Sequence, residues 1–89
     1  MISEQDKAVI VEIARRFGVA EVLLFGSSAV PNRPSDDIDI AVAGIMPQKF
    51  FSFYGELLFN LSKPVDLIDL SKDTKFNRLV RREGIRLYG

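Results

Sequence analysis

The sequence predicts a small α+β domain, in which α-helices flank a mixed β-sheet. Apolar residues recur at three- and four-residue spacings in three stretches, as is typical of amphipathic helices. Shorter apolar or alternating runs lie between these stretches and are typical of strands. The 89 residues, 47% of them hydrophobic, suit one domain over residues 1–89 with a single core.

The first helix is expected over residues 4–17. Ser3 is a suitable N-cap, because its hydroxyl can accept a hydrogen bond from the first turn, and Gly18 is well placed to end the helix. A strand is expected over 19–25. It leads into a Gly-Ser turn at residues 26–27, where glycine allows a close backbone approach.

The second strand is expected over residues 37–43, after a polar loop at 31–35. Its residues alternate between acidic and apolar, so Asp37 and Asp39 share one face of the strand. The apolar residues between them share the other face, which can enter the core.

A second helix is expected over residues 47–61, with Pro47 in its first turn. It is rich in aromatic residues, which we interpret as core or a dimer surface rather than a cofactor pocket. A strand over 65–70 follows. The last helix is expected to have Ser71 as its N-cap and to end at Gly84, before a short final strand. Its inward-facing residues are predicted to be Phe76, Leu79 and Val80.

Composition excludes several classes of function. Twelve basic and twelve acidic side chains cancel, so direct nucleic-acid binding and attraction to an anionic membrane are not expected. Cysteine and histidine are absent, which excludes disulfides, thiolate catalysis, a Ser-His relay and the usual zinc sites. No apolar run approaches the roughly 20 residues needed to cross a bilayer, so a cytoplasmic protein is expected. Carboxylates with a metal ion are the main catalytic option left.

The acidic pair and the Gly-Ser turn together indicate a site. Two carboxylates about 5 Å apart repel each other by roughly 3 kcal/mol at an effective dielectric near 20, and a cation relieves that repulsion. Hard oxygen ligands favour magnesium. The turn at 26–27 suits a phosphate group, because N–H groups at a helix start can bind anions. The sequence therefore predicts a metal-nucleotide site.

Asp66 stands inside the apolar strand expected over 65–70, where an unpaired charge would be costly. It either completes the metal site, or accepts backbone hydrogen bonds, or pairs with a basic residue. Asp69 falls on the opposite face of that strand and is interpreted as structural.

Three motifs together resemble those of a known family. They are Leu24-Phe25-Gly26-Ser27, then Asp37-Ile38-Asp39-Ile40, and later Pro64-Val65-Asp66-Leu67-Ile68-Asp69. This combination resembles the DNA polymerase beta nucleotidyltransferase superfamily, in particular its minimal nucleotidyltransferases. Those small proteins are often encoded beside a HEPN-type partner, and several act as antitoxins. The closing stretch over 83–88 also resembles the usual end of these domains.

The resemblance implies a nucleotidyltransferase fold and a metal-dependent enzyme. Such an enzyme would move AMP from ATP to a hydroxyl acceptor, a tyrosine of a HEPN-type toxin, and release pyrophosphate. Two magnesium ions would be held by the catalytic residues Asp37, Asp39 and Asp66. The nucleotide-binding residues would be Gly26, Ser27, Ser28 and Arg33.

The chain also departs from the family pattern. Relatives usually carry arginine directly after Gly-Ser, where this chain has Ser28, and Arg33 in the loop is the candidate to supply the missing charge. The alternative hypothesis is a non-catalytic antitoxin that neutralises its partner by contact. The candidate docking surface is a basic stripe on the last helix, Lys75, Arg78 and Arg82.

Overall fold

A computed structural model describes residues 2–89 of the chain. The elements in chain order are α1 (Glu4–Phe17), β1 (Glu21–Leu24), η1 (Gly26–Ala29), β2 (Ile38–Ala43), η2 (Pro47–Lys49), α2 (Phe50–Asn60), β3 (Val65–Asp69), α3 (Lys75–Glu83) and β4 (Ile85–Tyr88). The η elements are short 3₁₀-helices. The predicted α+β class and the predicted order of elements are confirmed.

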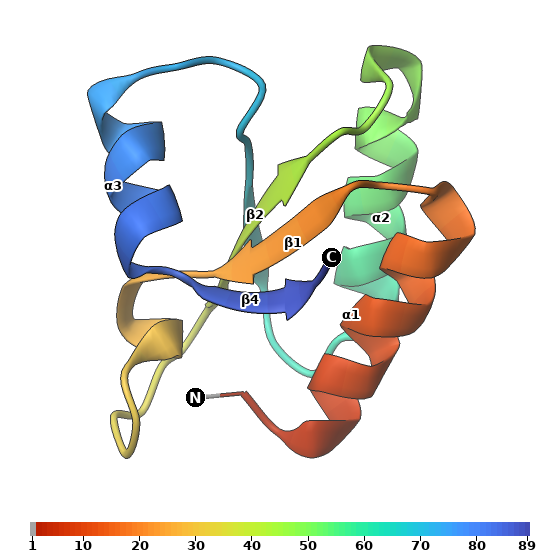
Figure 1. Cartoon of the computed structure of the whole chain (residues 1–89). Helices are drawn as coiled ribbons and strands as arrows, with labels where there is room; N and C mark the ends of the chain where they lie inside the picture. Colours follow the sequence, from red (N-terminus) through yellow and green to blue (C-terminus); the bar gives the residue numbers. More distant parts are fainter. Residues whose placement is uncertain (1) are drawn as a thin grey trace.

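The four strands form one mixed sheet in the order β3-β2-β1-β4. Figure 1 shows β1 between β2 and β4. β1 pairs antiparallel with both β2 and β4, whereas β2 and β3 run parallel. A parallel neighbour requires a crossover connection, and α2 provides it between β2 and β3. This crossover brings β3, which carries Asp66, beside β2, which carries Asp39.

One face of the sheet is covered by α1 and α2 and holds the larger core. Ile10 and Phe53, one from each helix, are completely buried there. Phe53 meets Phe17 edge to face, with ring centroids 5.4 Å apart. The sheet contributes Val22, Leu24, Ile38, Ile40 and Val42 to this core. Burial of large apolar side chains is the main source of stability, so this face carries most of it.

The other face is covered by α3 and holds a smaller core of Leu23, Ala41, Leu70 and Val80. The predicted burial of Val80 is confirmed, but Phe76 and Leu79 remain 52% and 42% exposed, so the prediction for these two residues was wrong. A nine-residue helix presents only a narrow stripe to the sheet, and Asn77 occupies part of it.

The start of α3 also differs from the prediction. Thr74 is the N-cap, and its hydroxyl accepts a hydrogen bond from the Asn77 N–H at 3.0 Å. The Ser71 N–H instead donates to the Asp69 carboxylate at 2.9 Å, which ties down the turn before the helix. Asp69 therefore has the structural role expected of it.

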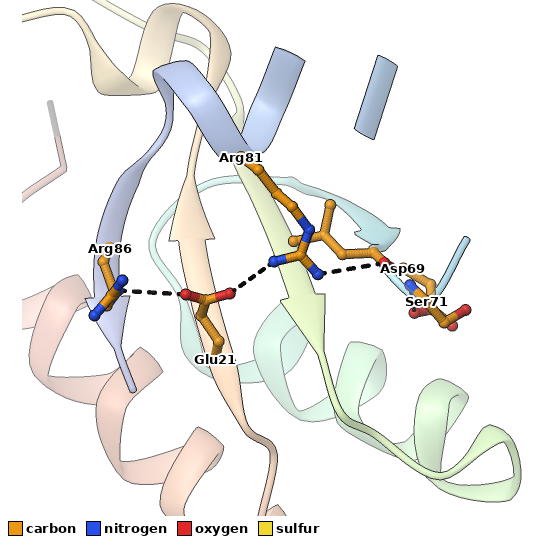
Figure 2. Close-up of polar contacts among 6 residues, drawn as sticks. Glu21, Asp69, Ser71, Arg81 and Arg86 are labelled. Carbon is orange, nitrogen blue, oxygen red and sulfur yellow. Dashed lines mark hydrogen bonds and ion pairs between the residues drawn. The ribbon is translucent and has the colours of Figure 1, made fainter. Parts of the chain in front are cut away.

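Ion pairs hold α3 against the strands. Figure 2 shows the Glu21 carboxylate of β1 between two arginines, with Arg81 of α3 at 3.1 Å and Arg86 of β4 at 3.3 Å. A second guanidinium nitrogen of Arg81 lies 3.5 Å from the Leu70 carbonyl oxygen. These contacts supplement the small apolar core on this side of the sheet. No helix within residues 2–89 has the length and apolar character needed to span a membrane.

Candidate active site

Asp39 and Asp66 lie directly opposite each other on the two parallel strands, β2 and β3. Side chains in register on neighbouring strands point to the same face of a sheet. Asp39 is two residues from Ala41, so both acids lie on the face covered by α3. The parallel pairing thus places two carboxylates side by side.

The electrostatics of Asp39 reflect this crowding. Its pKa is raised above the usual value, first because the carboxyl is partly withdrawn from water. The negative charges of Asp66 and Asp37 raise the pKa further, as does a hydrogen bond with the Asp66 carboxyl group. A bound cation would act in the opposite direction, because it favours the charged form of the carboxyl.

Gly26 lies against the Asp39 carboxylate. Its φ of +63° is in the left-handed region, which glycine adopts without strain. A Cβ atom added to Gly26 would lie 2.5 Å from Asp39 Oδ2, closer than any real contact permits. Glycine therefore suits both the turn and the close approach of the turn to the Asp39 carboxylate, which a Cβ atom would displace.

Asp37 lies just before β2, which begins at Ile38 rather than at residue 37 as predicted. Its side chain is exposed, and its charge acts on Asp39. Within the described chain, no three histidine, cysteine or acidic side chains are already arranged to hold a metal ion. The structure thus brings Asp39 and Asp66 into contact and leaves Asp37 close by at the edge.

The serines of η1 have different surroundings. Ser27 is partly exposed, and its hydroxyl lies 3.2 Å from the Ser35 hydroxyl. Ser28 is 1% exposed, and its hydroxyl hydrogen-bonds to the backbone of β2. Arg33 lies in the exposed loop, where its N–H donates to the Val30 carbonyl at 3.4 Å. Of the four residues expected to bind nucleotide, Gly26 thus lies against the Asp39 carboxylate, Ser27 is partly exposed in η1, Ser28 lies beneath the surface and Arg33 lies on the exposed loop.

An open cleft of about 580 Å³ lies over the carboxylate pair. Besides Asp39 and Asp66, its lining includes Phe25, Phe50, Phe51, Tyr54 and Phe76. The interpretation of the aromatic helix as core holds for Phe53 but misses this role of its neighbours. Periodicity did not reveal this role, because Phe50 and Tyr54 each lie three residues before a buried residue, Phe53 and Leu57, and share their side of the helix.

The chemistry of the site fits a hard divalent cation. Its donors are carboxylate oxygens, which magnesium prefers, and neighbouring like charges raise the pKa of one of them. Gly26 leaves space beside Asp39 that any larger residue would fill. The residues that would hold such an ion are Asp39 and Asp66, with Asp37 at the edge.

Residues 8–89 match the model of the protein family described as "Polymerase beta, Nucleotidyltransferase". The match includes every motif residue discussed above. No curated protein sequence matches the chain.

Several solved structures with the same fold come from toxin–antitoxin complexes. A chain of a toxin–antitoxin complex with AMP-PNP is 28% identical, with a TM-score of 0.76 over 93% of this chain and 73% of that one. A chain of the complex of a tri-AMPylated Shewanella oneidensis HEPN toxin with an MNT antitoxin is also 28% identical, with a TM-score of 0.72 over 94% and 70%. A chain of the MntA-HepT toxin–antitoxin complex is 26% identical, with a TM-score of 0.73 over 98% and 73%.

Proposed function

Because the chain belongs to the polymerase beta nucleotidyltransferase family, we propose that it transfers AMP from ATP to a tyrosine hydroxyl of a HEPN-type toxin and so acts as an antitoxin. The observation that carries this proposal is the carboxylate pair of Asp39 and Asp66, held in register beside the Gly26 turn. The similar solved structures support the choice of partner and nucleotide, since their descriptions name a HEPN toxin and AMP-PNP.

Asp37, Asp39 and Asp66 would hold two magnesium ions together with the phosphates of the nucleotide. When bound, these ions neutralise charge on the phosphates and lower the pKa of the attacking hydroxyl group. The apolar face of β2 is buried in the core, so the strand that carries Asp39 has a fixed position. Rigid placement of the acids limits the reorganisation needed during the reaction.

Gly26 and Ser27 would hold the β and γ phosphates of ATP. They begin the 3₁₀-helix η1, and the first N–H groups of a helix lack partners within it. Arg33, on the exposed loop between η1 and β2, would supply positive charge from outside. The aromatic side of the cleft, lined by Phe50 and Tyr54 among others, offers flat apolar surfaces for the adenine ring.

The reaction conserves atoms and charge without a further co-reactant. The acceptor oxygen forms a bond to the α-phosphorus of ATP, and the bond from that phosphorus to the bridging oxygen breaks. Pyrophosphate leaves with the electron pair. The hydroxyl proton passes to a carboxylate oxygen of the Asp39–Asp66 pair and from there to water.

The test is transfer of label from α-labelled ATP to a purified HEPN-type partner in the presence of magnesium. We expect label on the partner, dependent on magnesium and on a tyrosine of the partner. Omission of magnesium and replacement of ATP by γ-labelled ATP are the controls, and neither should give a labelled partner.

The second candidate function is neutralisation by contact alone. Two points favour it: the family resemblance implies an arginine where this chain has Ser28, and the acids of the described chain do not already form a three-ligand metal site. A folded protein that binds and inhibits the partner without labelling it would establish this alternative and overturn the enzymatic proposal.

A further inference from the structure

We propose that Ser28 is a positioning residue that fixes where the carboxylates of Asp37 and Asp39 lie. The inference rests on the proposed function, since it concerns the same acids. It gives this buried serine a role beneath the site rather than on the nucleotide.

Ser28 bridges the backbone of the two acidic residues. Its hydroxyl donates to the Asp37 carbonyl oxygen at 2.9 Å and accepts from the Asp39 N–H at 3.1 Å. A serine hydroxyl has a single proton, and this pattern uses it. Because Ser28 is also 1% exposed, its hydroxyl is engaged inside the protein and is not available to an incoming phosphate.

The sheet explains why β2 needs such a partner at this point. The antiparallel pairing of β1 with β2 ends at Leu24 and Ile40, and the Phe25 N–H then donates to the Asp39 carbonyl at 3.0 Å. At Gly26 the chain turns away from the sheet into η1. The Asp39 N–H and the Asp37 carbonyl therefore extend beyond the strand that would otherwise pair with them, and the Ser28 hydroxyl replaces that strand for both groups.

Ser35 supports the same carbonyl from the loop. Its hydroxyl donates to the Asp37 oxygen, and its own carbonyl accepts from Lys63 Nζ at 2.7 Å. Ser35 is less buried than Ser28 and does not contact the Asp39 N–H. We therefore expect Ser35 to contribute less than Ser28 to the position of the acids.

Loss of the Ser28 bridge should weaken ligand binding by more than a general loss of fold stability would. Groups that orient the ligands of a metal typically change metal affinity by about 10- to 100-fold when they are replaced. We expect Ser28→Ala and Ser28→Cys to weaken binding of magnesium with AMP-PNP by at least about tenfold, measured by calorimetry on folded protein. Ser28→Thr, which keeps the hydroxyl, should recover most of the affinity.

Thr74→Ala is the matched control for general destabilisation. It removes a hydroxyl that also accepts a backbone hydrogen bond, but at the N-cap of α3 and away from the acids. This variant should melt at a lower temperature and keep the wild-type affinity. If Ser28→Ala and Ser28→Cys, shown to be folded, bind magnesium with AMP-PNP within twofold of wild type, the positioning role is overturned.

Amide hydrogen exchange separates failure of this inference from failure of the proposed function. In Ser28→Ala, the Asp39 N–H should exchange faster relative to the other β2 amides, whereas Thr74→Ala should leave this ratio unchanged. Wild type that does not bind magnesium with AMP-PNP would overturn the proposed function. An unchanged Asp39 exchange ratio in Ser28→Ala would overturn the bridge itself, whatever the nucleotide result.

Discussion

The two faces of the sheet are built for different purposes. The face under α1 and α2 is filled by large apolar side chains, and Phe53 and Leu57 are completely buried there. The face under α3 has a core of four buried residues, supplemented by the ion pairs of Glu21 with Arg81 and Arg86. The acids and the cleft lie only partly covered on this second face.

The same strands serve both faces because strand residues alternate. In β2, Ile38 and Ile40 point into the large core, while Asp39 between them points to the cleft. Packing on one side therefore fixes the position of a charged group on the other. The repulsion between the acids is a local cost that the large core offsets, as expected where a site is arranged to bind a cation.

The largest expected effect is on catalysis and should leave the large core intact. Asp37→Asn and Asp39→Asn each remove a negative charge with almost no change in volume. We expect each to reduce AMP transfer to the partner by several orders of magnitude, with an unchanged circular dichroism spectrum. Labelling that persists in both folded variants would show that Asp37 and Asp39 are not catalytic.

A matched series of phenylalanines compares the stability of the two faces. We expect Phe53→Ala to lower the free energy of unfolding by about 3–5 kcal/mol, because Phe53 is fully buried. Phe76→Ala should cost roughly 1–2 kcal/mol, since Phe76 is half exposed and meets Phe25 edge to face.

Phe59→Ala is the control for this series. Phe59 is 87% exposed, so we expect a change within about 0.5 kcal/mol. Urea unfolding measures all three variants, with equal m-values required for the comparison. Equal losses at Phe53 and Phe76 would mean that the two faces contribute alike to stability.

Local patterns in the sequence predicted most of the fold. The helix over 4–17 has the predicted bounds, because Ser3 and Gly18 are unambiguous signals at its two ends. The start of α3 was wrong because two hydroxyl residues three apart, Ser71 and Thr74, can both serve as N-cap. The choice between them depends on the Asp69 carboxylate that engages the Ser71 N–H, a tertiary detail.

The site was less predictable, since its contacts join distant parts of the chain. The alternation of acidic and apolar residues placed Asp39 on one face of a strand. Asp66 lies beside it because β2 and β3 pair in parallel, and these two strands are separated in the sequence by a helix. The bridge from Ser28 to the β2 backbone spans a polar loop without periodicity. No local pattern encodes either contact. The position of Asp66 in an apolar strand left three roles open, and the family resemblance favoured the one that places it with Asp39.

The third prediction concerns the repulsion between Asp39 and the neighbouring acids, and the relief of that repulsion by a bound cation. Because the pKa of Asp39 is raised in the folded state, its charged form destabilises the fold at neutral pH. Asp39→Asn should therefore melt at a higher temperature than wild type without ligand. This advantage should shrink as the pH falls through the raised pKa toward the ordinary value of 3.8, because the wild-type carboxyl is then protonated.

Magnesium with ATP should reverse the order of the two melting temperatures, so that wild type melts higher than Asp39→Asn. A ligand that binds only the folded state stabilises it by RT ln(1 + [L]/Kd), about 2.7 kcal/mol at a hundredfold excess over Kd. Wild type should gain this stabilisation, and Asp39→Asn should not. If Asp39→Asn melts lower than wild type without ligand, and wild type shows no shift with magnesium and ATP, the acids are structural.

The smallest expected effect concerns the outer side of α3. Arg81 is engaged with Glu21, whereas the basic stripe of Lys75, Arg78 and Arg82 is exposed. The nearest acids, Asp73 at 3.3 Å from Arg78 and Glu83 at 3.6 Å from Arg82, are themselves exposed and neutralise the stripe only in part. An acidic surface on the partner would complement it.

Reversal of two charges tests this docking role. Exposed ion pairs contribute about 0.2–1 kcal/mol each, so Lys75→Glu with Arg78→Glu should weaken association with the HEPN-type partner by roughly tenfold at low salt. The difference from wild type should decrease as salt is added, because screening removes the attraction. Lys7→Glu with Arg15→Glu makes the same change of charge on α1, on the opposite side of the sheet, and should have little effect. Equal affinities for wild type and both double variants at every salt concentration would leave α3 as a structural cover without a docking role.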